Sequence, residues 1–122
     1  MNEIAQYLKM FIEPGTVTEL RAFGDGQAIH GTFDYEHLDD MAKAATDLAS
    51  CRGVYFLPNP IHLEATNRTT VGGKCATDND VVRRRWVLID IDPDRPRDSN
   101  ATQAERDAAW RVAKNCHALL EA

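Results

Sequence analysis

The sequence has 122 residues, of which 43% are hydrophobic and 27% are charged, and its formal net charge is −5. These values are typical of one globular domain over residues 1–122, and they exclude a disordered chain or a surface that is basic throughout. No apolar stretch approaches the roughly 20 residues of a membrane helix, and the N-terminus lacks a signal-peptide pattern, so we expect a cytoplasmic protein that does not bind membranes.

The first half of the chain alternates between helical and strand spacing. Its first apolar positions recur at helical intervals: Ile4, Tyr7, Leu8 and Phe11. They predict a short amphipathic helix over residues 3–12. Residues 16–23 and 28–34 are rich in β-branched and aromatic side chains and are joined by a glycine-bearing turn, which predicts a β-hairpin. A second helix is expected over residues 38–48.

The second half continues with strands, a loop and a helix. Residues 53–60 predict a short buried strand, and the polar residues 64–80 predict a mobile surface loop. Residues 86–91 are almost entirely apolar, which favours a central strand covered on both faces. Thr102 and Glu105 have the spacing of a capping box that opens a last helix. We therefore expect an α+β fold, an αβ sandwich in which helices pack on a mixed sheet.

Three cysteines are present, at widely separated positions: Cys51, Cys75 and Cys116. They form no CxxC pair, and no histidine stands at a ligand spacing from them. This predicts free thiols rather than a zinc site or a disulfide framework.

Asp90 and Asp92 stand at the end of the strand expected at 86–91. Because side chains alternate along a strand, both carboxylates would lie on one face with their Cβ atoms about 7 Å apart, where they can converge on a hard cation. In the alternative interpretation, Asp92 begins a turn with Pro93 while Asp90 accepts a hydrogen bond from a loop.

Positive charge is concentrated in the same region. Residues 66–97 carry seven basic and five acidic side chains, whereas residues 1–65 carry four and ten. Arginine contacts phosphate in a bidentate manner, which makes three consecutive residues candidates for nucleotide or nucleic-acid binding: Arg83, Arg84 and Arg85. Arg84 and Asp90 are an even number of residues apart, so in one continuous strand their side chains would lie on the same face. Lys74 follows two glycines and could contact phosphate, although the spacing of a P-loop is absent.

Four segments together carry a family resemblance: TVTELRAF, GVYFLPNP, ATDNDVVRRRWVLIDIDPDRP and the Ser99-Asn100-Ala101-Thr102 that opens a helix. In this order and spacing the chain resembles the N-terminal part of the catalytic domain of phage- and plasmid-type primase-polymerases, in the archaeo-eukaryotic primase superfamily. An apolar strand ending in Asp-x-Asp, with proline next and an arginine two residues further on, looks like the first catalytic motif of this family.

The resemblance implies a nucleotidyltransferase of DNA replication with an RRM-like core. Asp90 and Asp92 would be catalytic and would hold Mg²⁺ or Mn²⁺, and Arg95, less surely Arg84, would lie near the phosphates or the template. The implied partners are nucleoside triphosphates, a single-stranded DNA template, and a helicase domain or the remaining C-terminal part of such a catalytic domain.

The family pattern continues with a Ser-x-His element and a further metal-binding aspartate, and neither is found in these 122 residues. We therefore expect the chain to be an N-terminal part or a shortened relative that is catalytically incomplete alone. One alternative is a non-catalytic module on the same scaffold, for assembly or for binding single-stranded nucleic acid. Another is a metal-dependent nuclease or a sugar-nucleotide enzyme, because both also use Asp-x-Asp.

Overall fold

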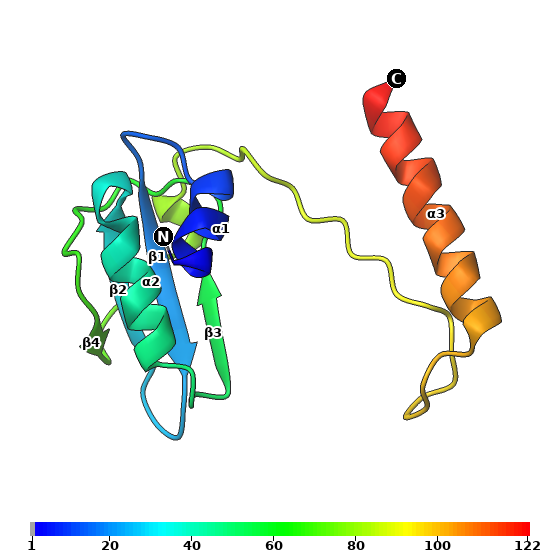
Figure 1. The fold of residues 1–122 in the computed structure, drawn as a ribbon, viewed down its shortest axis with the longest axis horizontal. Helices are drawn as coiled ribbons and strands as arrows, with labels where there is room; N and C mark the ends of the chain where they lie inside the picture. Colours follow the sequence, from blue (N-terminus) through cyan, green and yellow to red (C-terminus); the bar gives the residue numbers. More distant parts are fainter. Residues whose placement is uncertain (1) are drawn as a thin grey trace. The chain divides into compact units, whose positions relative to one another are not determined.

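The chain folds into a four-stranded antiparallel sheet with two helices on one face, and it continues through an extended segment into a long helix (Figure 1). The computed structural model describes residues 2–122. It divides into two compact units, one ending at Val87 and the other spanning Leu88–Ala122. The prediction of one domain over residues 1–122 stays a prediction, and each unit is described by itself.

The elements of the first unit follow the predicted order closely. In chain order they are α1 (Glu3–Phe11), β1 (Val17–Phe23), β2 (Ile29–Asp34), a 3₁₀ turn (Tyr35–His37), α2 (Leu38–Asp47), β3 (Gly53–Phe56), β4 (Thr70–Val71) and a second 3₁₀ turn (Asp78–Asp80). The expected helices and the hairpin are therefore confirmed. The strand expected at 53–60 is present only over Gly53–Phe56, and it is partly exposed rather than buried. Asn2 begins α1 by accepting a 2.8 Å hydrogen bond from the Ile4 N–H, because the first amides of a helix lack partners within it.

The sheet has the strand order β3-β1-β2-β4, and every neighbouring pair is antiparallel. The α+β class is confirmed. No parallel pair occurs among the strands of residues 2–122, so the sheet is not the mixed sheet that was expected. The short turn between β1 and β2 requires those two strands to be antiparallel. The chain then returns through α2, so β3 pairs with the opposite edge of β1 and runs antiparallel to it.

The core lies between α1, α2 and one face of the sheet. Leu20 of β1 and Phe33 of β2 point to this face, and both are nearly inaccessible to solvent. They pack with apolar side chains from the two helices, among them Leu8 and Met41. In Figure 1 both helices lie over the same side of β1 and β2. Burial of these side chains contributes about 1.5–3 kcal/mol each, which makes this layer the main source of stability.

Residues 64–80, expected to be a mobile loop, are instead bound to the sheet. They contain β4, which pairs with β2, and the Asn67 N–H donates a 2.7 Å bond to the Thr32 carbonyl. The backbone at Arg68 passes so close to Gly31 that a Cβ there would lie 2.1 Å from the Arg68 carbonyl oxygen. Polar composition indicated a loop correctly, but it did not reveal that β2 supplies a partner for this backbone.

The central strand expected at residues 86–91 is absent, because residues 82–96 form neither helix nor strand. A strand needs a neighbour for its backbone groups. Here the Asn59 side chain takes the place of a neighbouring strand. Its Oδ1 accepts hydrogen bonds from the N–H groups of Arg85 and Trp86, and its Nδ2 donates one to the Trp86 carbonyl. No strand lies beyond this side chain, and Leu88 is 89% exposed.

The second unit contains α3 (Gln103–Glu121), opened by the predicted capping box. The Thr102 Oγ1 accepts a 3.2 Å bond from the Glu105 N–H, and the Glu105 carboxylate accepts a 2.8 Å bond from the Thr102 N–H. These bonds hold the pKa of Glu105 below its ordinary value of 4.5. Within residues 2–122, none of the helices combines the length and the apolar character that crossing a membrane requires.

Candidate functional site

Asp90 and Asp92 are both exposed, in the extended segment that precedes α3. Neither carboxylate makes a hydrogen bond or an ion pair with any residue that the structure describes. This does not match the alternative in which Asp90 accepts a bond from a loop. Because the segment is not a strand, the face-sharing argument for the pair, and for Arg84 with Asp90, does not apply in this conformation.

Asp92 lines a hollow of about 450 Å³ together with Arg95 and Arg97. Arg95 is held by a bond from its Nη1 to the Ser99 carbonyl, within a turn in which Asp98 has a φ of 59°. Aspartate tolerates this left-handed conformation better than most residues. The hollow therefore brings together a carboxylate, which can bind a cation, and guanidinium groups, which can bind phosphate.

Asp90 lines a second hollow, of about 390 Å³, with side chains of α3 that include Arg106 and Trp110. Arg106 donates to the Ala101 carbonyl at 2.7 Å and to the Gln103 side chain at 3.0 Å. Arg106 could not be predicted as a site residue from the sequence, because a single arginine on a helix belongs to no motif. Arg106 and Asp90 line the same hollow because the turn at 96–99 reverses the chain between the segment that carries Asp90 and α3.

Two of the three consecutive arginines are held at the end of α1 and just beyond it. The Arg83 Nη2 and the Arg85 Nε lie 2.6 and 2.7 Å from the Glu13 carboxylate, and Arg85 also donates to the Phe11 carbonyl. The Arg85 guanidinium lies 5.1 Å from the centre of the Trp86 ring. Arg84 is exposed and, unlike Arg83 and Arg85, has no ion-pair partner among residues 2–122.

The face of the sheet opposite the helices carries buried polar side chains. The strand register places Glu19 and Arg21 of β1 on this face beside His30 of β2. Glu19 is 1% exposed and His30 is 7% exposed. The Arg21 Nη2 lies 2.5 Å from the Glu19 carboxylate, which neutralises part of its charge. A buried carboxylate without such a partner would be costly.

Three potential metal ligands meet at this polar face: one donor atom each from Glu19, His30 and Cys75 lies within 4.8 Å of the other two. Cys75 is half-buried, and Lys74 beside it lines a hollow of about 250 Å³ together with Glu19 and His30. Sequence spacing could not reveal this cluster, because its members come from β1, β2 and a distant loop. The cysteines were predicted to be free, and all three are unbonded to one another.

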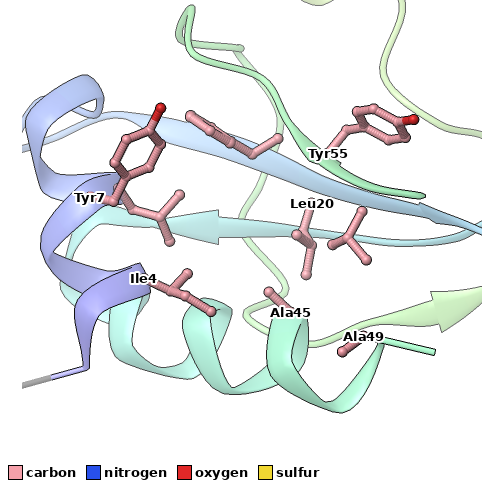
Figure 2. A pocket seen from close by; sticks show the side chains of 9 residues that line it. Ile4, Tyr7, Leu20, Ala45, Ala49 and Tyr55 are labelled. Atoms are coloured by element: carbon pink, nitrogen blue, oxygen red, sulfur yellow. The ribbon is translucent and has the colours of Figure 1, made fainter. Parts of the chain in front are cut away.

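An apolar hollow of about 370 Å³ lies on the other side of the sheet, between the helices and β3. Figure 2 shows its lining, which includes Ile4 and Tyr7 of α1, Leu20 of β1, Ala45 of α2 and Ala49, which follows α2. No charged side chain lines it. A binding or catalytic site usually adds a few convergent polar groups to an apolar hollow, and this one has none among its lining residues beyond the tyrosine hydroxyls.

No family model, curated protein or solved structure matches the chain. Functional inference therefore rests on the residues themselves. In the second unit, Asp90 and Asp92 could bind a cation while Arg95 and Arg97 bind phosphate. The cluster around Glu19 is a separate, softer set of ligands in the first unit.

Proposed function

We propose that the chain carries the first catalytic motif of a primase-polymerase nucleotidyltransferase, in which Asp90 and Asp92 bind Mg²⁺ or Mn²⁺. The observation that carries the proposal is that both carboxylates are exposed and without internal partners, and that Asp92 shares its hollow with Arg95 and Arg97. Residues 76–96 also resemble the first catalytic motif of the family, in which the two aspartates would bind the metal ion.

The proposed chemistry follows from the charges. A metal ion held by Asp90 and Asp92 would supply the positive charge that brings a 3′-hydroxyl and the α-phosphate of a nucleotide together and offsets the charge of the pyrophosphate leaving group. Asp90 and Asp92 supply the hard oxygen ligands that such ions prefer. Arg95 and Arg97 would neutralise phosphate oxygens that the metal does not reach. Arg84 remains a candidate for binding the template or the phosphates. Lys74 lines the hollow beside Glu19 and not the one that contains Asp92.

We further propose that these 122 residues provide only part of a catalytic centre. The sequence contains no Ser-x-His element and no further acidic strand, so a second group of ligands would have to be supplied by additional protein, such as a further catalytic segment or a helicase-linked partner. Robust primer synthesis by the purified 122-residue protein would contradict this part of the proposal.

Metal binding tests the assignment directly. We expect Mn²⁺ to bind in isothermal titration, and the binding heat to disappear in Asp90→Ala and in Asp92→Ala while the circular dichroism spectrum is unchanged. The matched control is Asp94→Ala, which removes a carboxylate of the same segment that the family pattern does not use. Equal Mn²⁺ binding by all four proteins would refute the assignment of the pair.

A second candidate function, a non-catalytic module that binds single-stranded nucleic acid, is favoured by a different observation. Phe23 of β1 and Tyr55 of β3 lie on the sheet face opposite the helices, with their rings 5.8 Å apart and their side chains 44% and 60% exposed. Exposed aromatic rings on a sheet face can stack on unpaired bases. In this case Tyr55→Ala should weaken oligonucleotide binding, Tyr55→Phe should preserve it, and Asp90→Ala should have no effect.

A further inference from the structure

The polar cluster of Glu19, His30 and Cys75 lies in the first unit and contains none of the residues proposed to bind the nucleotide or its metal ion. Its three donor atoms come within 4.8 Å of one another, and two of the three residues are buried. Tetrahedral zinc, with ligand distances of 2.0–2.3 Å, needs donors about 3.4 Å apart. The three donors are therefore already near the separation that a bound zinc ion requires, and the half-buried Cys75 side chain is the one least confined by its surroundings.

The hydrogen bond of His30 leaves one ring nitrogen suited to a metal. The His30 Nε2 lies 2.6 Å from the Gly72 carbonyl oxygen, which can only accept, so Nε2 carries the proton. Nδ1 therefore keeps its lone pair in the neutral ring. A metal-binding histidine usually donates its other N–H to a carbonyl or carboxylate in this way, which fixes the tautomer.

Glu19 holds the segment that carries the cysteine. Its Oε2 accepts a 2.6 Å bond from the Ala76 N–H, and its Oε1 accepts a 2.7 Å bond from Arg21, whose Nη2 also donates to the Ala76 carbonyl at 2.8 Å. Cys75 is thereby kept next to the carboxylate. Each carboxylate oxygen has a second lone pair, so Glu19 can bind a cation while these bonds persist.

We propose that Glu19, His30 and Cys75 form a binding site for Zn²⁺. A thiolate, an imidazole and a carboxylate are the ligands that zinc takes, whereas Mg²⁺ and Mn²⁺ prefer oxygen ligands alone. Carboxylate and thiolate place two negative charges beside the ion, and Arg21 adds one positive charge next to the carboxylate. The thiol proton is released to solvent when the Zn–S bond forms. Three protein ligands leave the fourth position to water. The ion would fasten the loop at 72–76 to the sheet.

The test uses Co²⁺ as a spectroscopic substitute for Zn²⁺. We expect one equivalent of Co²⁺ to produce a thiolate-to-metal charge-transfer band, and one equivalent of Zn²⁺ to remove it. Cys75→Ser should abolish the band and lower Zn²⁺ affinity more than about 100-fold, above the 10–100-fold loss typical of outer ligand changes. His30→Gln should lower the affinity as well.

Matched controls separate this site from other thiols and from the acidic pair. Cys51→Ser and Cys116→Ser should retain the band, and so should Asp90→Ala, whose effect belongs to Mn²⁺ binding. Cys75 is half-buried, so its replacement by serine should leave the fold intact, which circular dichroism checks. Absence of a band in the parent protein, or a band that survives Cys75→Ser, would overturn the zinc site and leave the nucleotide-site proposal untouched.

Discussion

At the scale of single residues, Asp34 and His37 form a pair whose charges depend on pH. The His37 Nδ1 lies 2.6 Å from the Asp34 carboxylate. Their hydrogen bond is the main reason that the pKa of His37 is raised above 6.5 and the pKa of Asp34 is lowered below 3.8. The pair lies where β2 ends and the turn into α2 begins.

The sign of the effect on stability follows from these two directions. The contribution of His37 is complete below pH 6.5 and is lost as pH rises through its raised folded-state pKa. The contribution of Asp34 is complete above pH 3.8 and is lost as pH falls through its lowered folded-state pKa. The pair should therefore stabilise the fold most between these two values.

Urea unfolding of the parent protein and of His37→Gln can measure this effect. We expect the difference between their midpoints to be larger near pH 5 than near pH 9, because only the parent loses an ion pair over that range. His117→Gln is the control, since His117 faces Glu121 on an exposed surface where such pairs contribute little. A difference for His37→Gln that does not change with pH would contradict the prediction.

At the scale of elements, the approach of the segment at Arg68 to β2 depends on Gly31. A methyl group at this position would overlap the Arg68 carbonyl oxygen, which is backbone and cannot rotate away. We expect Gly31→Ala to lower the free energy of unfolding by about 1–3 kcal/mol, the usual cost of overpacking. Gly24→Ala is the matched control, because an added Cβ there meets only the Cys51 Sγ at 3.9 Å. Equal urea midpoints for the two variants would show that the close approach is not required.

The sequence predicted α1, the hairpin, α2, β3 and α3 because their signals are local: apolar spacing, turn residues and capping side chains. It failed at residues 86–91 for a physical reason. Apolar and β-branched composition measures how well a segment suits a sheet, but it does not provide the neighbouring strand. Asn59 satisfies the backbone of Arg85 and Trp86 instead, and amide side chains of loops leave no recognisable pattern in a sequence.

The candidate sites also differ in whether their residues are close in the sequence or only in the folded protein. Asp90, Asp92 and Arg95 are neighbours in the chain, so they could be proposed as a site without a fold. Arg106 and the cluster of Glu19, His30 and Cys75 could not, because folding alone brings their side chains together. In particular, the spacing of Cys75 predicted an ordinary free thiol, and only the loop held by Glu19 places it beside His30.

At the scale of the whole molecule, the buried side chains are concentrated in the first unit. They occur between Ala5 and Ala76, whereas α3 has no buried residue. We therefore expect a protein that ends at Val87 to fold by itself, with slow amide exchange in β1 and β2.

The fluorescence of Trp86 can follow this fragment through urea unfolding, because the second tryptophan of the chain, Trp110, lies outside it. The Trp86 indole N–H donates a 3.0 Å bond to the Phe11 carbonyl, and the two rings lie 5.0 Å apart, so its emission should change cooperatively when α1 leaves the sheet. Met41→Ala in the same fragment should lower the free energy of unfolding by about 2–5 kcal/mol, since Met41 is fully buried in the core. A gradual transition that Met41→Ala leaves unchanged would mean that the first unit is not a self-sufficient folding unit.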